Sequence, residues 1–335
     1  HWSICLLGPS GINGPTPINK RPSAMTGRLF LSAMSELNLP HFFILGAPKC
    51  GTTSLAAYLA DHPKVYFSQP KEPNYFNMDF SESHRKFHSL DSYANACFPA
   101  ASKDLLRGEA TVWHLVSDVA IEEILKAVPQ ARCIVMLRDP KELIPSLHAT
   151  LLRALTEDVH DAHQAFLLQD QRRQGKHIPA TSRNLHQLLY TEVASLGKQM
   201  QRLQSLVPEN RIHCIWFDDF KASPKAAYES TCGFLGIQPE AIETFSNHNP
   251  RKVIHAKWLA WVIGRLSQSK WIRKTKQSLG FTMGKGPLST LSQLNSKEVA
   301  SEGISLDFQA DIKEALSEDV ALLASLTGRN LDHWL

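Results

Sequence analysis

Long hydrophobic runs are missing from this sequence of 335 residues. No run approaches the ~20 apolar residues that a helix needs to cross a bilayer. Residues 4–7, Ile-Cys-Leu-Leu, are too short for the core of a signal peptide. We therefore expect a soluble, cytoplasmic protein, although a chain that begins at His1 and not at methionine leaves room for an omitted upstream anchor.

Paired cysteines are also missing. The six cysteines are scattered without a Cys-x-x-Cys pair, and a chain of this length does not need disulfides to hold its core. We interpret them as free thiols in a reducing compartment, and Cys50 as a small residue in a tight turn. The histidines lack a ligand pattern supported by cysteines or carboxylates, so no metal site is predicted. These histidines include His84, His88, His160 and His163.

Acidic residues are absent between residues 244 and 297, where ten basic residues lie. Trp258, Trp261 and Trp271 are interleaved with them. Such a segment either covers something anionic or forms an amphipathic helix with tryptophans in the core. It favours contact of residues 251–276 with a polyanion or a membrane surface. The net charge of only +4 and the lack of a recognisable module argue against nucleic-acid binding.

The sequence does contain alternating strand and helix patterns. Strand-like runs lie at 41–46, 64–67, 132–137 and 211–217, and helix-like segments lie near 52–61, 117–127, 139–157, 184–206 and 223–235. This alternation predicts an α/β fold of three layers, with a mainly parallel central sheet flanked by helices.

The domain organisation follows from the same patterns. Residues 1–33 are rich in Gly, Pro and Ser and are expected to form a poorly ordered N-terminal extension. Residues 34–335 are expected to form a single domain. Within it, residues 34–240 are the predicted α/β core and residues 250–335 a mostly helical C-terminal appendage.

The most informative stretch is residues 41–55. Four apolar residues, Phe42–Leu45, suit a buried strand, and a Pro/Gly-containing loop at 46–51 follows. The hydroxyl residues at 52–54 can cap a helix whose free N–H groups point at an anion. Lys49 adds a positive charge to the same place. The junction is typical of a phosphate site.

The position of the lysine decides which phosphate chemistry is favoured. A Walker A loop has the pattern G-x-x-x-x-G-K-[ST], in which the lysine follows the second glycine. Gly46 and Gly51 fit the two glycines, but Thr52 stands at the lysine position and Lys49 lies inside the loop. This departure argues against an ATPase or GTPase.

A second phosphate site is indicated after the run 132–137. This core strand delivers Arg138 at its carboxyl end, where open parallel sheets bind ligands. Asp139 and Pro140 then begin a helix, and Ser146 follows Arg138 by eight residues, about two helical turns. Arg138 and Ser146 are therefore expected to meet at one phosphate.

Together these motifs resemble those of sulfotransferases that use 3′-phosphoadenosine-5′-phosphosulfate (PAPS), in particular the carbohydrate-type and bacterial members. P-K-x-G-T-T-S-L at 48–55 is similar to their 5′-phosphosulfate loop, and Arg138 with Ser146 to their 3′-phosphate site. Residues 71–76 resemble the K-E-P-x-x-F segment, residues 108–114 the G-E-x-T-x-x-Y segment, and 319–334 the ending of bacterial members. The resemblance implies the P-loop NTPase-like sulfotransferase fold.

The resemblance also implies roles for single residues. Glu72 is expected to be the general base, with His114 as the competing candidate, and Lys49 to stabilise the leaving group. Lys71 and Glu109 are expected to contact substrate, and no metal is required. The residues expected to bind the donor are Lys49, Cys50, Gly51, Thr52, Thr53, Ser54, Arg138, Ser146, Arg251 and Lys252. For the family's R-K-G loop, 251–252 and 285–286 are both candidates.

The predicted function is transfer of a sulfuryl group from PAPS to a hydroxyl or amine by in-line attack. Two alternatives stay open, namely a P-loop kinase or nucleotide hydrolase and a non-catalytic protein that binds nucleotides or anions. The acceptor is a glycan, a lipid or a small alcohol or amine. The sequence does not indicate which, nor does it indicate the oligomeric state.

Overall fold

The structure is a computed structural model that describes residues 37–99, 104–182, 184–242, 245, 252–254, 296–298 and 303–334. The predicted extension 1–33 lies outside these residues, as does nearly all of the basic segment 251–276. The elements described below belong to one compact unit, Asn38–Leu335.

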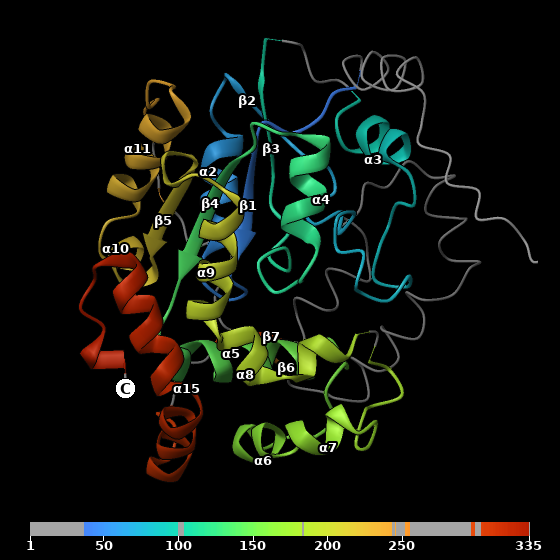
Figure 1. Cartoon of the computed structure of the whole chain (residues 1–335), viewed down its shortest axis with the longest axis vertical. Helices are drawn as coiled ribbons and strands as arrows, with labels where there is room; N and C mark the ends of the chain where they lie inside the picture. Colours follow the sequence, from blue (N-terminus) through green and yellow to red (C-terminus); the bar gives the residue numbers. More distant parts are fainter. Residues whose placement is uncertain are drawn as a thin grey trace, which may run out of the picture. The chain divides into compact units, whose positions relative to one another are not determined.

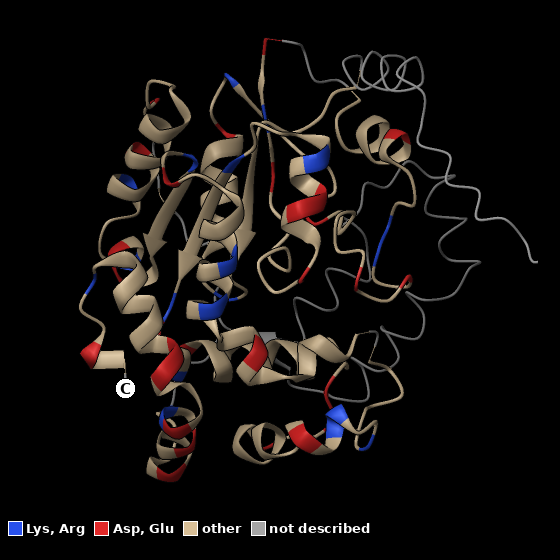
Figure 2. Ribbon diagram, in the orientation of Figure 1, with Lys and Arg blue, Asp and Glu red and all other residues tan. Residues whose placement is uncertain are grey.

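A five-stranded sheet in the order β2-β3-β1-β4-β5 forms the centre (Figure 1). Every neighbouring pair in this sheet is parallel, as predicted. The strands are β1 (Phe42–Gly46), β2 (Val65–Phe67), β3 (Leu106–Glu109), β4 (Arg132–Leu137) and β5 (Ile212–Trp216). Most of the sheet carries no charge, and charged residues lie mainly on the helices and loops around it (Figure 2).

The two central strands are apolar along nearly their whole length. All five residues of β1 are buried, as are five of the six residues of β4. A parallel sheet with helices on both faces requires such continuous apolar runs, because neither side of the strand meets water. This explains why the sequence pattern identified both strands.

β3 was not predicted as a strand, because its sequence, Leu-Arg-Gly-Glu, has no apolar run. Its polar groups find partners inside the protein. The Nε atom of Arg107 donates to the carbonyl oxygen of Leu39 at 2.7 Å. Gly108 lies so close to the Phe42 ring that a Cβ atom would stand 2.2 Å from Cζ. The Phe42 ring therefore approaches the backbone of β3 so closely that only glycine fits at position 108.

Helices cover the sheet as expected at four positions: α2 (Thr52–Ala60), α4 (Ala120–Ala127), α5 (Pro140–Arg153) and α11 (Pro224–Leu235). Further helices are α3 (Leu90–Cys97), α6 (Ala162–Leu167), α7 (Gln169–Arg173), α10 (Phe217–Ala222) and α15 (Leu306–Thr327), with 3₁₀ turns η2 (Glu209–Arg211) and η3 (Asp332–Trp334).

The single helix predicted over 184–206 is divided into η1 (Leu185–Leu188), α8 (Tyr190–Ala194) and α9 (Leu196–Leu206). The new amino terminus at α9 is capped by Asp319, which belongs to α15. Its carboxylate accepts from the N–H groups of Gly197 at 2.8 Å and Lys198 at 2.9 Å. The helix interruption thus depends on a residue that is distant in sequence.

The predicted helical appendage, residues 250–335, lies only partly within the described residues. α15 is a long helix, and a Cβ atom on Gly197 would stand 2.2 Å from the carbonyl oxygen of Asp319, so α9 and α15 pack closely. Two short strands that were not predicted, β6 (Lys252–Ile254) and β7 (Ser296–Glu298), pair antiparallel. In the described part of the chain, no helix is long and apolar enough to span a membrane.

Candidate functional site

The site lies at the edge of the sheet where the parallel strands end. Loops that follow β1, β2 and β3, together with Arg138 after β4, all emerge at this edge. In Figure 1 the arrowheads of β4 and β5 point toward the side on which α5 and α10 lie. Open α/β sheets bind ligands at this edge.

The loop between β1 and α2 turns through three residues with positive φ, namely Gly46 at 146°, Lys49 at 66° and Gly51 at 86°. Gly51 is the N-cap residue of α2, and no described side chain caps the helix there. The hydroxyl residues at 52–54 were expected to cap the helix, but α2 begins at Thr52, so they lie in its first turn. The N–H of Ser54 donates to the carbonyl oxygen of Gly51 at 3.0 Å, and the positive end of the helix dipole lies at this terminus.

Cys50 is enclosed inside this loop. Its side chain is fully buried, and Sγ lies 3.4 Å from the carbonyl oxygen of Pro48. Burial raises the pKa of the Cys50 thiol to about 12, so the group is neutral at physiological pH. Cys50 therefore fills the turn and offers no thiolate to a ligand.

Arg138 joins the end of β4 to the loop after β1. Its Nη1 atom donates to the carbonyl oxygen of Lys49 at 2.7 Å. Nε and Nη2 donate to Oε2 of Glu142 at 3.0 and 2.9 Å, and the guanidinium carbon lies 4.1 Å from the centre of the Phe217 ring. Sequence reasoning missed Glu142 and Phe217, although the i,i+4 spacing of Arg138 and Glu142 predicts their ion pair.

Ser146 lies on α5, the helix that begins directly after Arg138. Pro140 occupies the first helical turn, and the N-cap Asp139 accepts from the N–H of Lys141 at 2.8 Å. Ser146 is partly exposed two turns further along. The helix therefore starts beside Arg138, as the sequence predicted.

Glu72 and Lys71 lie on the loop after β2. Their side chains form an ion pair at 2.9 Å and are 36% and 28% exposed. Lys86 donates to the carbonyl oxygen of Glu72. Glu72 is thus a carboxylate that solvent, and hence a substrate group, can reach.

Glu109 and His114 are both fully buried and contact each other. His114 Nε2 and Glu109 Oε1 lie 2.9 Å apart, and the Tyr93 hydroxyl donates to Glu109 Oε2 at 2.6 Å. Burial disfavours the ionised carboxylate, but His114 and the surrounding donors outweigh this and lower the pKa of Glu109. Solvent reaches neither side chain. Sequence reasoning missed Tyr93, which no motif contains.

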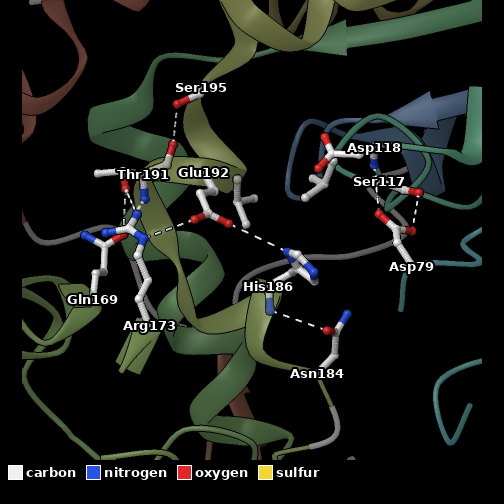
Figure 3. Close-up of polar contacts among 12 residues, drawn as sticks. Asp79, Ser117, Asp118, Gln169, Arg173, Asn184, His186, Thr191, Glu192 and Ser195 are labelled. Atoms are coloured by element: carbon white, nitrogen blue, oxygen red, sulfur yellow. Dashed lines mark hydrogen bonds and ion pairs between the residues drawn. The ribbon is translucent and has the colours of Figure 1, made fainter. Parts of the chain in front are cut away.

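A further polar cluster occupies the helices at 169–195 (Figure 3). Arg173 Nε donates to Glu192 Oε1 at 3.2 Å, and His186 Nδ1 lies 3.6 Å from Glu192 Oε2. The neighbouring Glu192 carboxylate raises the pKa of His186. No sequence motif indicated these residues, and the His186 ring also stacks on Phe80 with centroids 5.1 Å apart.

The structure thus connects some of the predicted residues and leaves others apart. Lys49 and Arg138 are joined directly, whereas Glu72 lies on a separate loop at the same sheet edge. Arg251 and the alternative at 285–286 lie outside the described residues, and only the backbone of Lys252 is described. In the described ranges no group of three histidine, cysteine or acidic side chains is arranged to hold a metal ion.

Comparisons with known proteins agree with this architecture. A crystal structure of a sulfotransferase from Alicyclobacillus acidocaldarius superposes with a TM-score of 0.65 at 21% identity, covering 88% of this chain and 98% of that one. The likeness supports the fold, a P-loop-like sulfotransferase fold.

Two curated relatives match parts of the sequence. Mouse carbohydrate sulfotransferase 15 is 28% identical over 165 residues, which are 37% of this chain and 29% of the mouse protein. The human bifunctional heparan sulfate N-deacetylase/N-sulfotransferase 2 is 26% identical over 207 residues, 60% of this chain and 22% of the human protein. The chain therefore spans less than a third of the length of these relatives.

The family profile described as "Sulfotransferase domain" matches residues 39–278, which include the loop at 46–51, Glu72, Arg138 and Ser146. The match covers more than half of the sequence. The chain belongs to the family of sulfotransferase domains.

Proposed function

We propose that the protein transfers a sulfuryl group from PAPS to a hydroxyl or amine acceptor. The observation that carries this proposal is the 2.7 Å hydrogen bond from Arg138 to the backbone of Lys49. It brings a second cationic group to a phosphate loop that already has an uncapped helix terminus. PAPS carries two phosphate-bearing positions, so a donor site for it requires two such anion sites.

The residues divide between the two ends of the donor. Lys49 and the N–H groups at the start of α2 bind the phosphosulfate. Arg138 and Ser146 bind the 3′-phosphate. Because Glu142 and Phe217 contact the guanidinium, its planar fork is held in place before the donor arrives.

Glu72 is the general base in this proposal. Its carboxylate is partly exposed, whereas the imidazole of the competing candidate His114 is fully buried against Glu109. As the acceptor oxygen or nitrogen bonds to sulfur, its proton passes to Glu72 and the bond from sulfur to the phosphate oxygen breaks. Lys49 stabilises the negative charge that develops on that phosphate. A positioned base contributes about 10²–10⁴-fold to such a rate.

A glycan is the acceptor class that we favour. The names of two relatives specify a carbohydrate and heparan sulfate as what those proteins act on. The basic residues between 244 and 297 would suit a polyanionic chain of this kind. Lys71, beside Glu72 on the same loop, is available to contact it.

Titration separates the proposal from a P-loop kinase or hydrolase. The purified protein is titrated with 3′-phosphoadenosine-5′-phosphate (PAP) and, separately, with ADP and Mg²⁺. We expect tighter binding of PAP, because Arg138 addresses a phosphate that ADP lacks. Preference for ADP with Mg²⁺ would contradict the proposal.

Transfer of labelled sulfate tests catalysis and distinguishes an enzyme from a binding protein. PAPS is incubated with desulfated heparan sulfate, chondroitin and 4-nitrophenol as acceptors. Glu72→Gln should lower transfer at least about 100-fold while PAP still binds. Glu82→Gln, which changes an exposed carboxylate nearby in the chain, should have no effect. Tight PAP binding without transfer to any acceptor would favour the non-catalytic alternative.

A further inference from the structure

Tyr93, Glu109 and His114 form a buried titratable cluster that the proposed reaction does not use. Each side chain lies in the fully buried core. Both carboxylate oxygens of Glu109 are engaged, at 2.6 Å by Tyr93 and 2.9 Å by His114. An ionised carboxylate is costly to bury, and polar groups of this kind often specify one arrangement of their surroundings more than they add stability.

The cluster packs directly against the segment that follows Glu72. The ring of Tyr75 stacks on the Tyr93 ring with centroids 4.9 Å apart and an interplanar angle of 13°. Phe76 meets Tyr93 edge to face at 5.3 Å and His114 at 5.9 Å. Two consecutive residues of the Glu72 loop are therefore held by two members of the cluster.

Hydrogen bonds connect the same loop to the residues after β3. The N–H of Asn74 lies 3.4 Å from Thr111 Oγ1, and the Asn74 side chain donates to the carbonyl oxygen of Glu72 at 3.3 Å. Asn77 donates to the carbonyl oxygen of Trp113 at 2.9 Å. The backbone around Glu72 is thus fixed to the segment 111–114, which contains His114.

The other side of this segment contacts the phosphate loop. The N–H of Leu115 donates to the carbonyl oxygen of Leu45 at 2.9 Å. A Cβ atom on Gly46 would stand 2.6 Å from the carbonyl oxygen of Val112. Phe43 on β1 also packs against the His114 ring, with centroids 6.2 Å apart. The buried cluster therefore lies between the loop of the base and the strand that leads into the loop of the donor.

We propose that Tyr93, Glu109 and His114 are positioning residues that fix Glu72 relative to the donor loop. This inference rests on the proposed function of Glu72 as the base. The cluster acts through packing and hydrogen bonds and does not touch the substrate. A displacement of about 1 Å of a catalytic group can cost about 100-fold in rate, so loosening the cluster should lower turnover without affecting donor binding.

Tyr93→Phe tests the proposal with little change in volume. It removes the hydrogen bond to Glu109 and keeps the ring that stacks on Tyr75. We expect kcat for labelled-sulfate transfer to fall about tenfold or more, with the KM for PAPS and the affinity for PAP unchanged. Glu109→Gln, of the same size, serves as the second variant and should show the same separation of kcat from KM.

Tyr190→Phe is the matched control. Tyr190 is also fully buried and donates to a buried carboxylate, Glu157 Oε2, at 2.8 Å. Its partner is paired with Arg172 and not with the Glu72 loop. The two variants lose the same kind of hydrogen bond, so they should lose similar stability, while Tyr190→Phe should keep the kcat of the unmodified protein.

Two further measurements separate positioning from general weakening. Amide hydrogen exchange of residues 71–77 should become faster in Tyr93→Phe and stay unchanged in Tyr190→Phe. In a double-mutant cycle, Tyr93→Phe should lower the residual rate of Glu72→Gln by less than twofold, because the group it positions is already gone. Equal losses of kcat in Tyr93→Phe and Tyr190→Phe, or unchanged exchange at 71–77, would overturn the inference.

The turnover measurements on these variants also distinguish failure of the proposed base from failure of the positioning role. Normal turnover by Glu72→Gln refutes Glu72 as the base and, with it, the positioning role. Loss of turnover in Glu72→Gln together with normal kcat in both Tyr93→Phe and Glu109→Gln refutes the positioning role alone.

Discussion

Arg138 donates a 2.7 Å hydrogen bond to the carbonyl oxygen of Lys49, a residue 89 positions earlier in the chain. The bond joins the carboxyl ends of β4 and β1, which are neighbours in the sheet. It therefore connects the proposed 3′-phosphate site to the proposed phosphosulfate site. An arginine in this place can hold the loop and still direct its remaining edge toward a phosphate.

Arg138→Lys should weaken PAP binding about 10–100-fold. Lysine keeps the charge but lacks the planar fork, and a hydrogen bond to a charged group contributes about 1.5–3 kcal/mol. Isothermal titration with PAP measures the change. Arg132→Lys is the control, because Arg132 lies at the amino end of the same strand and donates to the carbonyl oxygen of Leu235 at 2.5 Å. An equal loss of PAP affinity in both variants would argue against a phosphate site at Arg138.

Lys49→Ala should lower turnover by orders of magnitude and leave the fold intact, because the leaving phosphate loses its cationic partner. Lys49 has a φ of 66°, which strains any residue with a Cβ atom by about 1–2 kcal/mol. Lys49→Gly removes the charge and this strain together. It should be as inactive as Lys49→Ala and more stable in thermal unfolding. Near-normal transfer by either variant would contradict the mechanism.

Gly108→Ala should destabilise the protein strongly, because the added methyl group would stand 2.2 Å from the Phe42 ring in the centre of the sheet. Overpacking of this kind costs about 1–3 kcal/mol or more. Gly233→Ala offers the contrast, since nothing lies within 4 Å of its Cβ position on α11. Alanine there should stabilise by up to about 1 kcal/mol. Urea unfolding of both variants measures the difference.

The sheet was predictable where burial imposes a continuous apolar pattern, as in β1 and β4. β3 was not predictable, because its residues look unsuited to a buried strand. Arg107 bonds to Leu39 and His41, and Gly108 makes room for the Phe42 ring, and these partners lie elsewhere in the sequence. The break before α9 has the same origin. Its cap, Asp319, is more than a hundred residues away from Gly197.

In the candidate site, too, some features could be predicted from the sequence and others could not. Motif spacing alone was enough to select Lys49 and Arg138 as candidates, because a strand, a tight loop and a helix terminus are local features. It did not determine the environment of the two candidate bases. Only the structure places His114 inside an aromatic and carboxylate cluster and Glu72 at a solvent-accessible position. The partner Tyr93 lies on α3, a helix that the sequence did not predict.

Asp139 should make the stability of the protein depend on pH in an unusual direction. Burial raises the pKa of this carboxyl from 3.8 to about 6, so the folded protein binds the proton more tightly than the unfolded chain. The stabilising contribution of that proton is complete below about pH 4 and is lost as the pH rises through about 6. Ionised Asp139 therefore opposes folding at neutral pH.

Asp139→Asn tests this sign. Asparagine cannot ionise, and its side-chain oxygen can still accept from the N–H of Lys141 at the N-cap. Since each pH unit between the two pKa values corresponds to about 1.4 kcal/mol, we expect the variant to be more stable by about 1–3 kcal/mol at pH 7.5. At pH 4 the two proteins should be nearly equal. Urea unfolding at both pH values gives the free energies of unfolding of the two proteins. A difference in stability that is the same at both pH values would mean that burial does not raise the pKa of Asp139.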